Sequence, residues 1–341
     1  MKSVVLKEIK KFEIEEKEEP ISQNGNVLID VKKAGICGSD IHYWDVGAPS
    51  GLVMGHEYCG IVTNPGDRND LKVGDRVTAL PISPCGHCPA CLKGNPQFCP
   101  ETWTYATGLS LTNPGAFAPK MAIRSDMILK VPDTISDNEV AMVEPTAVGL
   151  HAVHLANIEV GNKVLVIGGG IIGLVSAMLA KMEGASYVAL TETNPNRGKR
   201  AVSTGVADEW FNANDEKTIE NLLEITNGGF DVVLDCCGNT PAVSSALTMV
   251  KPGGKVVLAG VSLSTITFPS IMAVMKEITV QGAIAYTKEE FQTCIELMAN
   301  KQIDVERFVD DIVPLERVQE SFERLTSGTD SAVKILVDPN L

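Results

Sequence analysis

Four cysteines in one short stretch form the strongest metal-binding signal of the sequence. Cys85, Cys88, Cys91 and Cys99 have the spacing C-x2-C-x2-C-x7-C. Four thiolates this close in the chain can surround one Zn²⁺ tetrahedrally at about 2.3 Å per bond, the closed coordination of a structural site. Two disulfides are disfavoured because cysteines two residues apart rarely reach disulfide geometry, whereas spacing alone does not exclude an iron–sulfur cluster. The pattern predicts a structural zinc lobe at about residues 85–99.

A second group of candidate ligands has the composition of a catalytic zinc site. Cys37 opens the run Cys-Gly-Ser-Asp-Ile-His, and His56 and Glu57 follow a glycine. A thiolate, an imidazole and a carboxylate are all donors for Zn²⁺, and three protein ligands leave a position for water or substrate. The charges of the ion and these ligands sum to zero, so the ion keeps Lewis acidity toward an alcohol. Taken singly, a core thiol, a turn histidine and a surface carboxylate would explain the same residues.

A glycine-rich string after an apolar run indicates a dinucleotide site. Residues 166–173 contain G-x-G-x-x-G between a strand-like run and a helix-like run. Gly168 permits a tight turn, Gly170 lets the backbone approach a pyrophosphate, and Gly173 lets the helix pack on the strand. The residues expected to bind the cofactor are Gly168, Gly170, Ile171, Ile172, Gly173, Glu192 and Arg197.

The acidic residue required by such a site is Glu192, which lies 19 residues after Gly173 at the end of a strand-like run. A carboxylate at this position binds ribose hydroxyls and repels a 2′-phosphate, which favours NAD over NADP. Arg197, five residues further on, could neutralise a phosphate. An ordinary loop carboxylate is the alternative for Glu192.

Two different sequence patterns follow one another along the chain. The elements that they predict must position the candidate residues. Up to about residue 145, short alternating runs with frequent turns predict a β-barrel or sandwich. From residue 162, apolar strand-like runs alternate with helical segments, among them 216–226 and 240–250, and predict a parallel α/β sheet. Helices at 288–300 and 315–326 and a strand at 333–337 follow. The first domain is therefore expected to be discontinuous.

Composition narrows the function classes. A chain of 341 residues favours two domains. The net charge of −14 opposes binding to nucleic acid or to an acidic membrane. The N-terminus lacks the apolar core of a signal peptide and no run is long enough to span a membrane, so a cytoplasmic protein with reduced thiols is expected. The remaining cysteines, Cys59, Cys236, Cys237 and Cys294, are expected to be small buried hydrophobes.

Taken together, the motifs resemble the zinc-containing medium-chain alcohol dehydrogenase family. Five motifs carry the resemblance and run in the family's order: residues 37–42, residues 55–57, the cysteine quartet, Val143-Glu-Pro and the glycine turn. The resemblance implies a GroES-like β-barrel catalytic domain and a Rossmann domain with a doubly wound parallel sheet. The implied ranges are 1–146 for the catalytic domain, 147–284 for the NAD-binding domain, and 285–341 for the return to the catalytic domain.

The same resemblance implies roles for individual residues. Cys37 and His56 would be ligands of the catalytic zinc, and Asp40 would orient the histidine. Ser39 would pass the substrate proton onward, and His42 would be the outer end of this relay.

One departure points to a branch of the family. Alcohol dehydrogenase itself holds its catalytic zinc with two cysteines and one histidine. Here the position of the second thiolate is Glu144, which together with Glu57 resembles the polyol branch of sorbitol, threonine, butanediol and sugar-acid dehydrogenases. Glu57 is expected to ligate zinc, and Glu144 either to ligate it or to hold a water. The arginine that holds a polyol hydroxyl in sorbitol dehydrogenases is absent from 282–286, so the substrate pocket is expected to draw on Tyr43, Trp44 and the segment 103–105. Core packing is the alternative for Trp44 and Trp103.

The predicted function is a zinc-dependent oxidoreductase that transfers a hydride between NAD and a secondary alcohol, giving a ketone. The substrate would be a polyol, a sugar alcohol or a sugar acid. A threonine or 2,3-butanediol dehydrogenase is the alternative within the family, and a non-catalytic NAD-binding regulator with structural zinc is the alternative outside it. Two zinc ions per chain, NAD, and assembly as a homodimer or homotetramer are implied.

Overall fold

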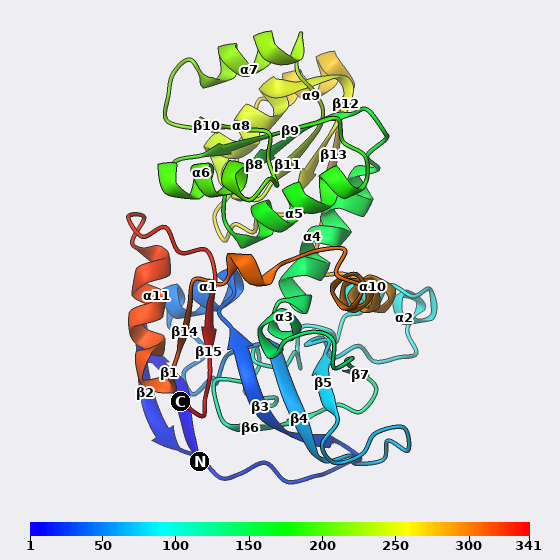
Figure 1. Cartoon of the computed structure of the whole chain (residues 1–341), viewed down its shortest axis with the longest axis vertical. Helices are drawn as coiled ribbons and strands as arrows, with labels where there is room; N and C mark the ends of the chain where they lie inside the picture. The colour runs from blue at the N-terminus through cyan, green and yellow to red at the C-terminus, as the bar shows by residue number, and fades with distance from the viewer. The chain divides into compact units, whose positions relative to one another are not determined.

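The computed structural model describes residues 1–341, which divide into two compact units (Figure 1). Unit 1 comprises Met1–Glu144 and Thr287–Leu341, and unit 2 comprises Pro145–Tyr286. Unit 1 is therefore discontinuous in sequence, because unit 2 is inserted between its two parts. Helix α4 (Val143–Ala156) begins in unit 1 and continues into unit 2.

Unit 1 is built on a mixed β-sheet, with a separate hairpin of β1 and β2. Its strands are β1 (Lys2–Glu8), β2 (Lys11–Glu16), β3 (Val27–Gly35), β4 (Glu57–Asn64), β5 (Arg76–Ala79), β6 (Lys120–Ile123), β7 (Ile128–Lys130), β14 (Asp311–Val313) and β15 (Ile335–Val337). Its helices are α1 (Gly38–Val46), α2 (Pro89–Leu92), α3 (Asp137–Ala141), α10 (Lys288–Ala299) and α11 (Val318–Thr326), with short 3-10 turns η1 (Pro96–Phe98), η2 (Glu306–Phe308) and η3 (Leu315–Arg317).

The order of strands in this sheet is β14-β15-β3-β4-β5-β7, with β6 pairing to β3. The alternation of apolar and polar residues in β3 gives alternately buried and half-buried side chains, as expected for a sheet with one face on the core. The C-terminal strand β15 runs antiparallel to β3 and pairs Leu336 with Gly35. Residues from the far end of the chain thereby reach the strand that leads into Cys37.

Unit 2 contains a parallel six-stranded sheet in the order β10-β9-β8-β11-β12-β13. Its strands are β8 (Lys163–Ile167), β9 (Tyr187–Glu192), β10 (Glu209–Asn212), β11 (Phe230–Asp235), β12 (Val250–Leu258) and β13 (Thr279–Gly282). Its helices are α5 (Ile171–Met182), α6 (Pro195–Ser203), α7 (Thr218–Thr226), α8 (Thr240–Met249) and α9 (Ser270–Lys276). In chain order the strands read 3-2-1-4-5-6, the order of a doubly wound dinucleotide-binding sheet, which confirms the predicted fold class.

The helices expected at 216–226 and 240–250 are α7 and α8, and the strand expected at 333–337 is β15. The sequence patterns do not predict α6, β10, α9 or β13. These elements are short, and β13 is exposed along its whole length, so their sequences lack a continuous apolar pattern. No helix combines the length and the apolar character needed to cross a membrane.

Each unit has its own hydrophobic core. In unit 1, Trp44 is 2% exposed and packs against Phe322 of α11 with ring centroids 5.6 Å apart. Trp44 is thus a core residue of unit 1, while Trp103 is exposed.

Candidate active site and metal centres

The run Cys-Gly-Ser-Asp forms the entry to α1 and holds two functional groups. Cys37 is the N-cap residue, and its backbone N–H donates to Oδ2 of Asp40 at 3.0 Å. An acidic side chain three residues after an N-cap is placed to reach back in this way. The other carboxylate oxygen, Oδ1, lies 3.2 Å from Nδ1 of His56, and neither atom has another partner. The fully buried Asp40 therefore fixes the backbone at Cys37 and the ring of His56 together.

A glycine determines where His56 and Glu57 lie at the start of β4. Gly55 has φ +95°, in the left-handed region, and a Cβ on it would lie 2.7 Å from Cδ1 of Phe117. Any larger residue would strain the backbone and displace the phenylalanine ring. The pairing of Glu57 with Gly35 in the β3–β4 ladder then brings these residues close to Cys37.

The electrostatics around Cys37 and His56 favour a bound cation. Burial raises the pKa of the Cys37 thiol, Glu57 and Glu144 raise it further, and His56 opposes them. Burial would lower the pKa of His56, but Asp40 and Cys37 raise it well above its ordinary value. The thiol and the imidazole also form a hydrogen bond with one another. The site thus concentrates negative groups in a buried space, which a metal ion would neutralise.

Glu57 is paired with a lysine that the sequence analysis does not predict. Nζ of Lys334 donates to Oε2 of Glu57, and both side chains are fully buried. Oε1 of Glu57 is buried and has no hydrogen-bond partner. The only sequence signal for Lys334 is a charge inside the apolar run 333–337. The orphaned oxygen, the thiol of Cys37 and the imidazole of His56 are all of the donor types that zinc accepts.

Glu144 reaches the same region from α4. It is 8% exposed, and its charge raises the pKa of the Cys37 thiol and of the Cys294 thiol on α10. The two predicted glutamates therefore act on Cys37 from different elements.

Ser39 and His42 lie on α1, three residues apart, on the same face of the helix. Oγ of Ser39 is 3.2 Å from Nε2 of His56. His42 is half-buried. Ser39 is half-buried as well, and the spacing is compatible with passage of a proton from the serine toward His42.

The four cysteines of the lobe lie close enough together to hold one metal ion. The sulfur atoms of Cys85, Cys88, Cys91 and Cys99 all lie within 4.8 Å of one another. The Sγ atoms of Cys88 and Cys91 are 3.5 Å apart, and those of Cys85 and Cys91 are 4.0 Å apart. Four sulfurs around one zinc ion at about 2.3 Å would be separated by about 3.8 Å. The cysteines are free thiols, so the residues fit the metal and form no disulfide.

Backbone groups support thiolates in this lobe. The N–H of Cys88 donates to Sγ of Cys85 at 3.3 Å, and the N–H groups of Cys85 and Glu101 donate to Sγ of Cys99. Burial opposes ionisation of Cys99, but these N–H groups lower the pKa of its thiol to about 6. A thiolate, not a thiol, is the form that binds metal.

The glycine turn in unit 2 joins β8 to α5. Gly168 has φ +105°, and its N–H donates to the carbonyl of Thr191 at 2.8 Å. Gly170 is the N-cap of α5, so the helix N-terminus faces the turn. A Cβ on Gly173 would overlap the carbonyl oxygen of Gly168. Close packing of helix on strand therefore requires glycine at this position.

A cavity of about 770 Å³ lies beside this turn, within unit 2. Gly168 and Glu192 line it, whereas Gly170, Ile171, Ile172, Gly173 and Arg197 are not part of its wall. Asp215, Glu216 and Asn239 also line it and were not predicted. These residues follow β10 and β11. Because doubly wound sheets bind ligands at such strand ends, a position directly after a predicted strand is the sequence signal that could have identified them.

Glu192 is 9% exposed and is held by backbone groups. Oε2 accepts from the N–H of Gly169 at 2.7 Å, and Oε1 accepts from the N–H groups of Thr193 and Asn194 at 2.7 and 2.8 Å. These bonds place a carboxylate between the glycine turn and the end of β9. Arg197 is half-buried on α6.

The expectation that Cys237 is buried is wrong. Strand β11 ends at Asp235, so the chain leaves the sheet core before Cys237, which is exposed and lines the cavity. Cys59 and Cys294 are buried as expected, and Cys236 is half-buried.

Two family models match the chain. The model described as "Alcohol dehydrogenase GroES-like domain" matches residues 23–133, and the model described as "Zinc-binding dehydrogenase" matches residues 172–300. Sorbitol dehydrogenase of Bacillus subtilis is 32% identical over 349 residues, covering 100% of this chain and 98% of that protein.

Solved structures agree with this result. 2R,3R-butanediol dehydrogenase from Bacillus subtilis is 29% identical with a TM-score of 0.88, covering 99% of each chain. A structure from Sinorhizobium meliloti bound to NADP is 27% identical with a TM-score of 0.90, also covering 99% of each chain.

Proposed function

Because the chain belongs to the zinc-containing medium-chain alcohol dehydrogenase family, we propose that it transfers a hydride between NAD and a secondary alcohol of the polyol, sugar-alcohol or sugar-acid class. The alcohol would be oxidised to a ketone, with its hydride passed to NAD⁺ and its hydroxyl proton released. Relatives named for sorbitol and for 2,3-butanediol support this substrate class, since both compounds carry secondary hydroxyl groups.

A single observation carries the proposal. The half-buried Cys37 interacts electrostatically with the buried His56 and Glu57, at a second site that is separate from the cysteine lobe. A regulator with only structural zinc would have no need of such a site. We therefore propose two zinc ions per chain. The catalytic ion would be held by Cys37, His56 and Oε1 of Glu57, with Glu144 as ligand or as holder of a water, and the structural ion by the four cysteines of the lobe.

In the proposed mechanism the two units have different tasks. Unit 1 would be the catalytic domain and unit 2 the NAD-binding domain. When bound, zinc supplies Lewis acidity that lowers the pKa of an alcohol, and NAD supplies the hydride acceptor. Asp40 keeps the His56 ring in one orientation through Nδ1, which leaves Nε2 for the metal. Ser39 would accept the hydroxyl proton and His42 would carry it outward.

We propose NAD rather than NADP as the cofactor. One structurally similar protein is bound to NADP, so this choice depends on the residues of this chain. The carboxylates of Glu192, Asp215 and Glu216 line the cavity beside the glycine turn. A 2′-phosphate would bring negative charge against this wall, whereas ribose hydroxyls can donate to it.

The proposal is tested by following NADH formation with zinc-replete protein. The panel comprises sorbitol, xylitol, galactitol, L-threonine, 2,3-butanediol and sugar acids, each with NAD⁺ and with NADP⁺. We expect one secondary alcohol to be oxidised, with kcat/KM at least about 100-fold higher for NAD⁺ because of the acidic wall. The matched control is the same protein stripped of metal by a chelator and reloaded with Zn²⁺. Activity that survives chelation, or a preference for NADP⁺, would contradict the proposal.

We also propose that the chain forms a homodimer or a homotetramer. The strand β13 is an edge of the sheet in unit 2 (Figure 1). All four of its residues are exposed. The preceding helix α9 exposes Ile271, Val274 and Met275, the last of them by 75%. An open edge beside exposed apolar side chains is a surface for pairing with a second copy.

Charges on α9 are therefore expected to prevent assembly. In the double variant Val274→Glu, Met275→Glu, the mass from light scattering should fall to the monomer value of 36.4 kDa. Both side chains are more than half exposed, so the fold of unit 2 should be unchanged. Lys217→Glu, which changes charge elsewhere on unit 2, is the control and should remain an oligomer. A wild-type mass of one chain would refute this part of the proposal.

A further inference from the structure

Lys334 is a fully buried lysine whose side chain has two partners, and both belong to the candidate metal centre. Nζ donates to Oε2 of Glu57, and to the carbonyl oxygen of Ile36 at 3.0 Å. Ile36 directly precedes Cys37. Lysine is almost never fully buried unless it is paired, because a charge removed from water needs compensation. Lys334 thus links the segment that carries Cys37 to the carboxylate of Glu57.

The surrounding backbone makes room for this ion pair. A Cβ on Gly35 would overlap Oε2 of Glu57 and would lie 3.0 Å from Cε of Lys334. Gly35 pairs with Glu57 on one side and with Leu336, two residues after Lys334, on the other. The two β-ladders therefore set the relative positions of the lysine and the carboxylate.

The two carboxylate oxygens of Glu57 have different surroundings. Oε2 is bound by Lys334, whereas Oε1 is buried and has no partner. A buried carboxylate oxygen without a partner is costly unless a ligand satisfies it. Oε1 is therefore the oxygen of Glu57 that a ligand would have to satisfy.

We propose that Lys334 is a positioning residue of the catalytic metal centre, which binds one oxygen of Glu57, limits this glutamate to a single-oxygen ligand and offsets its negative charge. The proposal rests on the proposed function, since that function places zinc at Cys37, His56 and Glu57. The formal charges of zinc, one thiolate and one carboxylate sum to zero, and the charge of the lysine raises this sum to +1. A positive centre binds its own metal less tightly but draws more electron density from an oxygen ligand.

The proposal predicts a gain of metal affinity when the lysine charge is removed. In Lys334→Met, the Kd of the more weakly held Zn²⁺, measured by chelator competition, should fall about tenfold or more, because a positive charge beside a dication is lost. With Co²⁺ as the probe at this site, visible absorption should weaken, because the freed second oxygen of Glu57 becomes an additional ligand. A lysine that only stabilised the fold would change neither the Kd nor the Co²⁺ spectrum.

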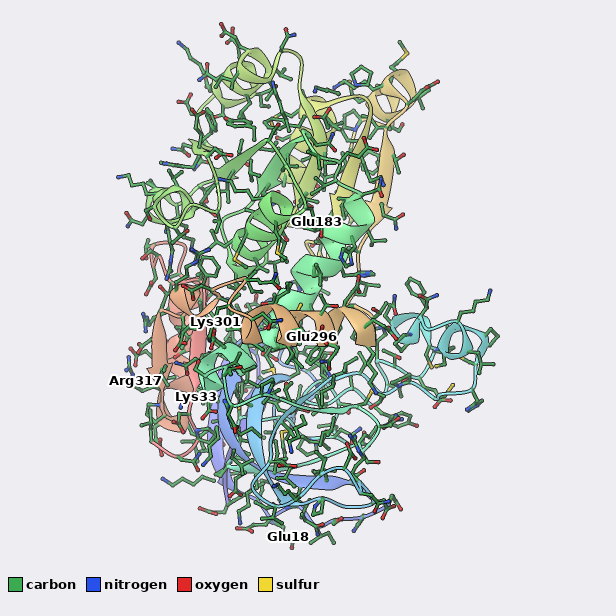
Figure 2. The ribbon with its side chains drawn as sticks, turned by 45° about the vertical axis from the view of Figure 1, so that its right-hand side comes forward. Glu18, Lys33, Glu183, Glu296, Lys301 and Arg317 are labelled. Atoms are coloured by element: carbon green, nitrogen blue, oxygen red, sulfur yellow. The ribbon has the colours of Figure 1, made fainter.

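A double-variant cycle keeps the test decisive if one variant is unstable. Glu57→Gln leaves Lys334 buried and unpaired, and it should weaken Zn²⁺ binding by about 100-fold or more. Glu57→Gln with Lys334→Met removes both charges and should regain at least about tenfold of that loss. Lys33, labelled on β3 in Figure 2, pairs with Asp338 at 2.6 Å, and Lys33→Met is the matched control that should leave the Kd unchanged.

The outcomes separate this proposal from the proposed function. An unchanged or increased Kd in Lys334→Met, or simple additivity in the double variant, would overturn the role of Lys334 even if the wild type oxidises an alcohol. A wild type that binds two zinc ions and oxidises no alcohol would overturn the proposed function, while the zinc and cobalt measurements would still decide the role of Lys334.

Discussion

Cys37→Ser is expected to abolish alcohol oxidation, lowering kcat/KM by about a thousandfold or more, while one zinc ion per chain remains bound. A serine hydroxyl is a poor zinc donor compared with a thiolate, and the Lewis acid contributes several kcal/mol to the transition state. Cys37 also loses its hydrogen bond to His56, so the remaining donors are less well organised. Metal content by elemental analysis and NADH formation together measure the effect.

The matched control is a cysteine of the other centre. In Cys88→Ser, the contact between the sulfurs of Cys88 and Cys91 at 3.5 Å is lost, and we expect the structural ion to leave. This variant should keep the catalytic zinc and lose stability in the lobe, because metal binding supplies its folding free energy. NADH binding should be unchanged in both variants, since the cavity lies in unit 2. Cys37→Ser with full activity, or with two bound zinc ions, would contradict the proposed catalytic centre.

Gly173→Ala should give the second large effect, on the cofactor side. The added Cβ overlaps the carbonyl oxygen of Gly168 and lies 3.4 Å from Cγ1 of Val166. Because the overlapping atom belongs to the backbone, α5 must move away from β8. We expect unit 2 to lose about 3 kcal/mol of unfolding free energy, and NADH affinity to fall about 100-fold. Denaturant unfolding and titration of NADH fluorescence measure the two quantities.

A substitution at the neighbouring Gly170 separates an effect on folding from an effect on cofactor binding. A Cβ on Gly170 would meet no atom within 4 Å, and φ at this residue is −73°. Gly170→Ala should therefore change the unfolding free energy by less than about 1 kcal/mol. It should still weaken NADH binding, because the proposed site brings the backbone at Gly170 close to the pyrophosphate. Wild-type NADH affinity in Gly170→Ala would show that the glycine turn does not bind the cofactor.

Short-range spacing made much of this protein predictable. Consecutive cysteines of the lobe are separated by at most seven residues, so a short local loop is enough to bring all four together around one ion. The glycine turn is equally local, because one tight turn between β8 and α5 dictates where side chains are forbidden. The apolar strand runs of unit 2 predicted a parallel sheet for the same reason, since a strand buried on both faces has few alternatives.

Helices and strands at the surface were less predictable. The edge strand β13 and the helix α9 expose most of their side chains, so burial imposes no periodic pattern on their sequences. Cys237 was misplaced because its apolar neighbours suggested a longer strand than β11, which ends at Asp235. The residue at which a strand ends depends on its hydrogen bonds to neighbouring strands. A short stretch of sequence does not contain these partners.

By itself, the sequence determined which functional groups are available: two groups of residues of the types that ligate zinc, a glycine turn typical of dinucleotide sites and an acidic residue after the second strand of its sheet. Only the tertiary structure decided how one donor set is completed. Lys334 and Glu57 are separated by 277 positions, and they meet because β15 and β4 both pair with β3 in fixed registers. No local pattern encodes such a meeting, because the free energy that drives it comes from the whole sheet and core rather than from the two residues that it brings together.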